Sequence, residues 1–233
     1  VDCCEGVTSI VQKLYWIINK QNKKVIFVIN KIDRLVMELR LDPSSAYQKL
    51  RSIVNALNAM SSHSDYFSPE ENNVLFASGK LNFIFSVKEF VSKFYYRSLN
   101  RNMNNVNEFA KRLWGNVSFG NGKFSKLDEK NQIPTFLEFI LTPLYKIMTH
   151  SLSLEPKELA KWLRDNLKID YCPISNSEYN AQLKSVFQTI FDSHDGLIDA
   201  VVTCVKKPEF IENAFRVQET PSTIAHVVKA VDY

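Results

Sequence analysis

Glycine is scarce in this sequence, since only six of its 233 residues are glycine. Glycine-rich loops bring backbone N–H groups close to phosphates, and the P-loop pattern GxxxxGK[ST] needs two glycines five residues apart. Only Gly115 and Gly120 have that spacing, and Gly120 is followed by Asn121 instead of lysine. These 233 residues therefore contain no P-loop, and phosphate binding by such a loop is excluded for them.

Cysteine and histidine are also few, with four of each. Cys3 and Cys4 are adjacent, Cys172 and Cys204 are isolated, and no cysteine or histidine pair has the spacing of a zinc site. We interpret the cysteines as reduced thiols that act as small buried apolar groups. No metal site is predicted from them.

Long apolar runs and an excess of one charge are absent as well. The longest run of large apolar residues, 25–29, is far below the ~20 residues of a membrane span, and no signal segment precedes it. The 29 basic and 25 acidic side chains leave a net charge of +4, which is too even to indicate a groove for DNA or RNA. A hydrophobic content of 45% is typical of a globular protein without a membrane segment.

The first 100 residues read as alternating helices and strands. The length favours one large domain, or one domain with part of another, because domains run ~100 to 200 residues. An apolar stripe over 7–18 predicts a helix with one buried face, and the apolar segments 25–29 and 73–77 predict buried strands. Ser86 and Glu89 form a capping box for a further helix. Strands joined by helical crossovers form an α/β sheet whose ligand binds at the carboxyl ends of the strands.

From about residue 100 the pattern is mainly helical. A hairpin is predicted around Gly120-Asn121-Gly122, and periodic apolar residues predict helices over 133–148, around 159–163 and over 179–190. Pro143 should kink the first of these helices, because proline removes one backbone hydrogen bond and crowds the preceding turn. This block resembles an insertion into the α/β domain.

The motif Asn30-Lys31-Ile32-Asp33 follows the first predicted strand and fits the NKxD pattern of guanine recognition. Guanine offers a ring N–H and an amine side by side, and the carboxylate of Asp33 can accept both. Adenine has no such pair, so the bidentate contact is worth ~1 to 3 kcal/mol of discrimination. The aliphatic stem of Lys31 would cover one face of the base. The Asn30 amide would bond the base edge and hold neighbouring loops.

A second polar motif, Ser78-Gly79-Lys80, follows the second predicted strand. We expect the Ser78 hydroxyl to brace the loop, the Gly79 N–H to face the guanine carbonyl oxygen, and the Lys80 side chain to cover the base edge. The alternative stays open that both motifs are ordinary polar turns and loop caps at strand ends.

Asp2 and Glu5 are conceivable magnesium ligands near the start of the chain. We favour a structural strand-to-helix turn, because a magnesium carboxylate is expected beside phosphate-binding loops that the sequence lacks. No catalytic residue and no metal ligand is therefore predicted.

Several stretches resemble the elongation factor 2 superfamily of GTPases. The resemblance covers residues 1 to about 148, and a final helix extends it to about 208. The stretches that carry it are VDCCEGV, VINKIDRLVMELRLDPSSAYQKLRSIV, SPEENNVLFASGK, FAKRLWGNVSF with GKFSK, FLEFILTPLYKI and LIDAVVTCVKKP. Within the superfamily, AYQKLRSIV, EFAKRLWG and FLEFILTPLYKI are closer to the spliceosomal branch, the GTPases of the U5 small nuclear ribonucleoprotein, than to ribosomal translocases.

The resemblance implies an α/β fold that is the carboxyl half of a P-loop-type GTPase domain. Residues 1–98 and 195–208 would form this half, 99–194 a mainly helical insert subdomain, and 216–233 the first strand of a β-barrel domain. The P-loop, the magnesium-binding switch and the catalytic histidine would precede Val1. The intact protein would bind GTP and GDP and hydrolyse GTP, with Mg²⁺ held by that missing half. The 233 residues alone are predicted to be inactive.

The resemblance also implies a nuclear role in pre-mRNA splicing. The expected partners are the U5 small nuclear ribonucleoprotein with its U5 RNA, a large scaffold protein and the RNA helicase that unwinds U4/U6. The nucleotide state would help to control spliceosome activation and disassembly. Two alternatives stay open: a ribosomal translocase or ribosome-maturation GTPase of the same superfamily, and an interaction scaffold that does not hydrolyse GTP.

Overall fold

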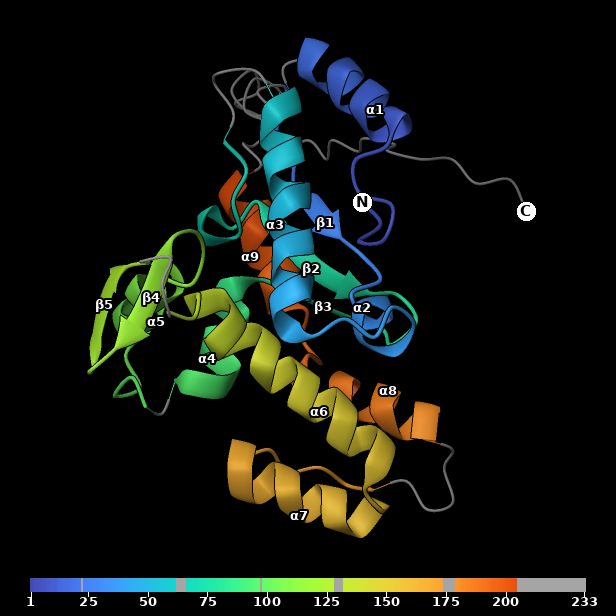
Figure 1. The fold of residues 1–233 in the computed structure, drawn as a ribbon, viewed down its shortest axis with the longest axis vertical. Coiled ribbons are helices and arrows are strands. Elements are labelled where there is room, and N and C mark those ends of the chain that lie inside the picture. The colour runs from blue at the N-terminus through green and yellow to red at the C-terminus, as the bar shows by residue number, and fades with distance from the viewer. Residues whose placement is uncertain (22, 62–65, 97, 128–131, 174–178, 205–233) are drawn as a thin grey trace, which may run out of the picture.

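The computed structural model of the chain describes residues 1–21, 23–61, 66–96, 98–127, 132–173 and 179–204. Helices flank a small central sheet, and a separate hairpin lies at one side (Figure 1). In chain order the elements are α1 Ser9–Lys20, β1 Phe27–Ile29, α2 Asp33–Met37, α3 Pro43–Met60, the 3₁₀ turn Pro69–Glu71, β2 Val74–Ser78, β3 Phe83–Phe85, α4 Val87–Tyr95, α5 Met103–Ala110, β4 Val117–Gly120, β5 Lys123–Lys126, the π-helical turn Leu137–Leu141, α6 Thr142–Ser153, α7 Pro156–Leu167, α8 Tyr179–Ile190 and α9 Asp195–Cys204.

The central sheet has the order β1-β2-β3. β1 and β2 are parallel, with Phe27 opposite Val74, and α3 lies between them in the chain and crosses in front of the sheet in Figure 1. On the other side of β1, Asp2 forms a single parallel bridge with Asn30. The predicted pair of parallel strands with a helical crossover is thus confirmed, and the beginning of the chain extends the sheet by one bridge.

The strands differ from the prediction in three ways: β1 is shorter than 25–29, β2 spans Val74–Ser78 instead of 73–77, and one further strand is present. β1 begins at Phe27, because residues 25 and 26 have no ladder partner. The strand β3 is not among the predicted elements; it returns antiparallel to β2 with Ser78 opposite Phe83. The reversal passes through Asn82, whose φ of 56° is left-handed and is a conformation that asparagine tolerates better than most residues. The resulting sheet is mixed.

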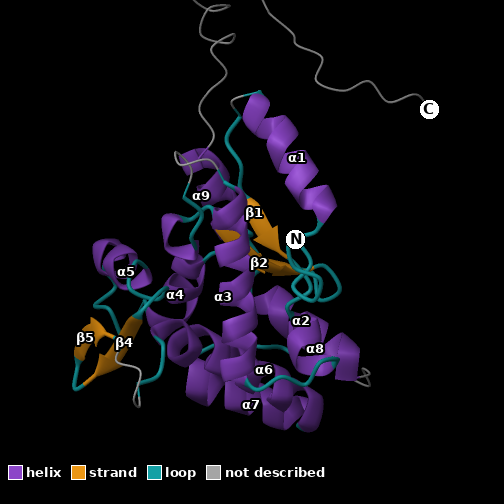
Figure 2. Ribbon diagram, turned by 45° about the horizontal axis from the view of Figure 1, so that its top comes forward, coloured by secondary structure: helices purple, strands orange, loops and turns teal. Residues whose placement is uncertain are grey.

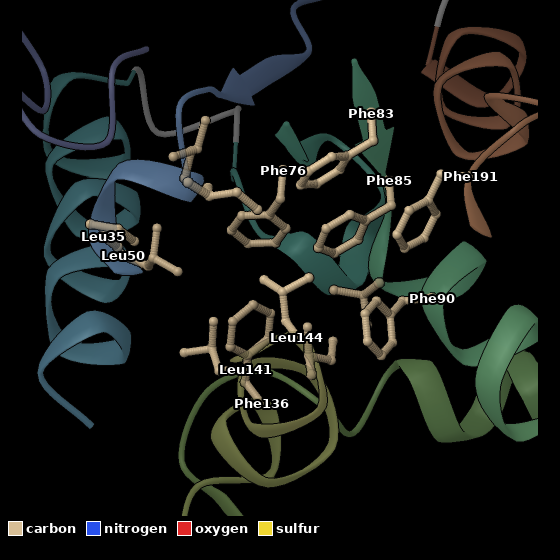
Figure 3. Close-up of a cluster of buried hydrophobic side chains, with 14 of the residues drawn as sticks. Leu35, Leu50, Phe76, Phe83, Phe85, Phe90, Phe136, Leu141, Leu144 and Phe191 are labelled. Atoms are coloured by element: carbon tan, nitrogen blue, oxygen red, sulfur yellow. The ribbon is translucent and has the colours of Figure 1, made fainter. Parts of the chain in front are cut away.

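Phenylalanine rings fill the space beneath the sheet (Figure 3). Phe76 of β2 and Phe85 of β3 are each 1% exposed. The ring of Phe85 stacks on the ring of Phe191, which follows α8, with 5.1 Å between their centroids. The ring centroids of Phe76 and Phe136 lie 5.2 Å apart. Phe136 and Phe191 both belong to residues 99–194, so this block and the sheet share one continuous hydrophobic core.

The segment around Pro143 contains a π-helical turn. The prediction of a single kinked helix over 133–148 is wrong at its start, because Ile133 precedes the helix and is 54% exposed. The π turn Leu137–Leu141 leads directly into α6. Proline has no N–H to bond the carbonyl four residues earlier, that of Phe139. This carbonyl accepts instead from the Tyr95 hydroxyl at 2.8 Å.

The predicted hairpin is confirmed. β4 and β5 pair antiparallel with Gly120 opposite Lys123, which leaves a two-residue loop. Asn121 and Gly122 have φ values of 51° and 75°, as a type I′ turn requires. The helices predicted around 159–163 and over 179–190 are α7 and α8.

Helix α1 and α7 lie at opposite ends of the molecule (Figure 2). Tyr15 is the buried residue of α1 and packs edge-on against Phe67, with ring centroids 5.8 Å apart. The expected buried face is confirmed in part: Val7 and Val11 are partly buried against the core, whereas Ile10 is 67% and Leu14 54% exposed. Of the helices that the structure describes, none has the length and apolar character needed to cross a membrane.

The predicted β-barrel strand within 216–233 lies outside the described residues, as does the end of the predicted segment 195–208 beyond Cys204. Within the described part of that segment, α9 packs against β3 and α4.

Candidate nucleotide-binding site

The two predicted motifs lie side by side at one edge of the sheet. Residues 30–33 follow β1, Ser78 is the last residue of β2 and residues 79–80 follow it, and these strands are parallel neighbours. The backbone N–H of Ile32 donates to the carbonyl of Ala77 at 3.1 Å. The fold therefore brings together two loops that are about fifty residues apart in the sequence.

The side chain of Asn30 joins these loops. Its Oδ1 accepts from the backbone N–H of Lys31 at 2.7 Å and from the backbone N–H of Gly79 at 3.0 Å. This is the loop-tying geometry expected for Asn30. The Gly79 N–H was expected to face a guanine carbonyl, but in this structure it is bonded to Asn30.

Ser78 and Lys80 differ in exposure. Ser78 is 0% exposed, and its hydroxyl accepts from the backbone N–H of Leu81 at 3.1 Å, so it braces the turn after β2. Lys80 is exposed at the rim of the same turn. The Ser78 hydroxyl thus lies where a group that braces the loop is expected, and the role of Lys80 in covering the base edge stays a prediction.

Asp33 opens the short helix α2 and is only 2% exposed. Its Oδ1 has no hydrogen-bond partner among the described residues. A buried carboxylate oxygen without a donor is costly, and a ligand with adjacent N–H groups removes that cost.

Lys31 has an unusual backbone and a paired side chain. Its φ of 66° lies in the left-handed region, which is costly for a residue with a side chain. Its ammonium lies 2.8 Å from the Asp2 carboxylate. The hydrogen bond to Asp2 raises the pKa of Lys31. Burial raises the pKa of Asp2. The hydrogen bonds from the Lys31 ammonium and the Cys4 N–H lower this pKa by more, so the net result is a lowered pKa.

Asp2, Cys3 and Cys4 are the one group of three possible metal ligands in the described part of the chain. The group does not fit a metal ion. The Asp2 carboxylate faces the ammonium of Lys31, and burial, with the nearby Cys4 and Asp2, raises the pKa of the Cys3 thiol, whereas a metal needs the thiolate. Glu5 is exposed and adds no ligand to the group, so these residues do not fit Mg²⁺ either.

The contact between Asp2 and Lys31 is not predicted from the sequence. Asp2 was interpreted only as part of a turn, and a spacing of 29 residues carries no periodic signal. The one available clue was the position of Val1-Asp2 before a helix, which is typical of the end of a strand that could neighbour β1.

The profile of the elongation factor Tu GTP binding domain matches residues 1–207 of this chain. The chain is 40% identical over 244 aligned residues to pre-mRNA-splicing factor SNU114 of Saccharomyces cerevisiae, and the alignment covers 100% of the chain and 24% of that protein. It is 33% identical to pre-mRNA-splicing factor cwf10 of Schizosaccharomyces pombe, with 93% of the chain and 22% of that protein covered.

A plant protein is similar as well. The 110 kDa U5 small nuclear ribonucleoprotein component CLO of Arabidopsis thaliana is 30% identical over 89% of the chain and 22% of its own length. The chain thus spans about a quarter of the length of these relatives.

Proposed function

This chain belongs to the family of the elongation factor Tu GTP binding domain, and on that premise we propose that residues 30–33 and 78–80 recognise guanine. The predicted resemblance to the spliceosomal branch of these GTPases is confirmed by the relatives. The observation that carries the proposal is the buried, unpartnered Oδ1 of Asp33 at the junction of two loops tied by Asn30.

The chemistry of this junction fits guanine. A single carboxylate can accept from the ring N–H and the amine of guanine, whereas adenine would leave the buried oxygen unpaired. Asn30 and Ser78 hold the loops at fixed positions before any ligand arrives, which lowers the entropic cost of binding. Lys31 and Lys80 lie at the exposed rim, where their stems can cover the base.

Replacement of Asp33 tests base recognition. In the full-length protein we expect Asp33→Asn to weaken GTP binding about 5- to 150-fold, the equivalent of a bidentate contact worth ~1 to 3 kcal/mol. The variant should favour xanthosine triphosphate, because its additional carbonyl accepts from an amide. Competition binding with both nucleotides measures the change.

Asp42→Asn is the matched control. Asp42 caps α3 by accepting from Ser44 and Ser45, and asparagine caps helices equally well. An unchanged preference for GTP in Asp33→Asn, with Asp42→Asn behaving like the wild type, contradicts the proposal.

We further propose that the 233 residues alone bind nucleotide weakly and hydrolyse little or no GTP. Phosphate and magnesium contacts supply most of the positioning and charge stabilisation in GTPases, and the sequence has no P-loop. When Mg²⁺ is bound in such a protein it neutralises phosphate charge; here no residue is assigned to it. Submicromolar affinity for GTP in isothermal titration of this chain contradicts this proposal.

A discontinuous GTPase domain made of residues 1–98 and 195–208, with 99–194 as an insert subdomain, is part of the proposal. Three contacts between α9 and residues 1–98 support this division. Gly196 donates to Glu89 at 2.9 Å, Lys88 pairs with Asp199 at 2.8 Å, and the Asn72 amide donates to the same Asp199 carboxylate at 3.2 Å.

For the whole protein we propose a GTP-dependent role in the spliceosome, within the U5 particle of the nucleus. The names of the relatives support this role, since they are splicing factors and U5 components. We extend it to control of the helicase that unwinds U4/U6, in contact with a scaffold protein and U5 RNA. A pull-down of the tagged full-length protein should enrich U5 RNA; enrichment of ribosomal RNA instead would favour the ribosomal alternative.

A further inference from the structure

Asp2, Cys3 and Asn30 each bind a different polar group of Lys31. The thiol of Cys3 donates to the carbonyl oxygen of Lys31 at 3.0 Å, and Oδ1 of Asn30 accepts from the Lys31 N–H. The Asp2 carboxylate binds the Lys31 ammonium. Every polar atom of this lysine, which has a left-handed backbone, is therefore hydrogen-bonded or ion-paired before any ligand is present.

Asp2 is itself fixed in place. Its Oδ1 accepts from the backbone N–H of Cys4 at 2.7 Å, which leaves Oδ2 for Lys31 at 2.8 Å and for Arg34 at 3.7 Å. The side chain of Asp2 is 13% exposed and that of Lys31 51%. The carboxylate is thus the rigid, shielded partner, and the lysine is the part that would otherwise move freely in water.

The backbone secures the register of this contact. Asn30 N–H donates to the Val1 carbonyl at 2.8 Å, and Cys3 N–H donates to the Asn30 carbonyl at 3.0 Å. These bonds flank the bridge between Asp2 and Asn30. A change in the position of Asp2 would therefore also shift Asn30, whose side chain ties residues 30–33 to residues 78–80.

We propose that Asp2 is a positioning residue for guanine recognition: its carboxylate holds the Lys31 side chain in the orientation that covers the base. This inference rests on the proposed function of residues 30–33. Lysine has a flexible stem with a strongly hydrated head, so an anchor at its ammonium reduces the freedom that is lost when the base binds. Asp2 thus acts through Lys31 and touches no part of the nucleotide itself.

The substitution Asp2→Asn removes the ion pair with Lys31 but keeps the hydrogen bond to the Cys4 N–H. The new amide oxygen can still accept from the Cys4 N–H, but the side chain no longer attracts Lys31. In the full-length protein we expect binding of a fluorescent methylanthraniloyl-GDP to weaken about three- to fivefold at low ionic strength. The loss should shrink toward zero near 0.5 M salt, because salt screens partly exposed charge pairs.

A double-mutant cycle distinguishes positioning from a purely structural role. In a Lys31→Met background, which keeps an apolar stem without its charge, Asp2→Asn should cause no further loss. Glu38→Gln is the matched control, since it removes a carboxylate paired with Arg34 and should leave the affinity unchanged.

Three results overturn the inference: no loss in Asp2→Asn, a loss of equal size at every salt concentration, or a loss that persists with Lys31→Met. If the wild-type protein fails to bind the probe at all, or if Asp33→Asn leaves its guanine preference unchanged, the proposed function fails instead.

Discussion

The polar edge of the sheet and the aromatic core beneath it are built by different interactions. At the edge, Asn30, Ser78 and Asp2 position two loops through hydrogen bonds and an ion pair. In the core, rings from β3 stack on Phe187 and Phe191, and the β2 ring Phe76 packs at a tilt against Phe136. Directional bonds determine where a ligand group lies, whereas apolar burial supplies stability. The two regions should therefore respond differently to mutation.

The largest effect is expected in the core. Phe85→Ala removes a ring that is 1% exposed and contacts those of Phe76, Phe90 and Phe191. We expect a loss of about 3–5 kcal/mol in the free energy of unfolding, typical of a buried phenylalanine, measured by urea denaturation. Phe124→Ala on the partly exposed hairpin strand should cost less. Equal losses would show that the core under the sheet is not the main source of stability.

An intermediate and pH-dependent effect is expected at the junction of α4 and α9. Glu89 is 5% exposed and accepts from the Gly196 N–H. Burial raises its pKa to about 7, against the lowering effects of the Gly196 N–H and Lys93. Because the folded pKa lies above the unfolded value, the stabilising contribution of the protonated form is complete below pH ~4.5. It is lost as the pH rises through about 7.

Glu89→Gln should therefore be more stable than the wild type at pH 8 by about 1–3 kcal/mol, and nearly equal to it at pH 4.5. The amide oxygen can still accept from Gly196. Thermal unfolding across this pH range measures the difference, and Glu71→Gln, at an exposed carboxylate, should show no such trend. A constant difference at all pH values would contradict the raised pKa.

The smallest effect is expected at the edge. A methyl group at Gly79 would meet the Asn30 side chain at 3.7 Å, an ordinary van der Waals distance, and the backbone N–H would still reach Asn30. Gly79→Ala should change the free energy of unfolding by less than about 0.5 kcal/mol and change GDP affinity little. Gly79→Pro removes that N–H and should weaken GDP binding while the core stays intact. Strong destabilisation by alanine would mean that edge and core are coupled.

Much of the fold could be predicted because its signals are local. The turn at Asn121-Gly122, the cap at Ser86 and the apolar periodicity of α7 and α8 each depend on residues within a few positions of one another. Two of the missed features are non-local: the shared core of Phe85 and Phe191, and the exposed side chains of Ile10 and Leu14 in α1. Whether these features form depends on the residues that pack against them in the folded protein, and local sequence propensity carries no information about those partners.

The sequence by itself determined the chemical types at the candidate site: a carboxylate at 33, an amide at 30 and a hydroxyl–glycine–lysine turn at 78–80. Residue type and position at the end of an apolar strand are enough for that prediction. Only the tertiary structure decided that Asn30 bonds Gly79, that Asp33 is buried with an unpaired oxygen and that Asp2 holds Lys31. The physical reason is that each of these contacts, or the burial itself, requires strands from distant parts of the chain to become neighbours in one sheet.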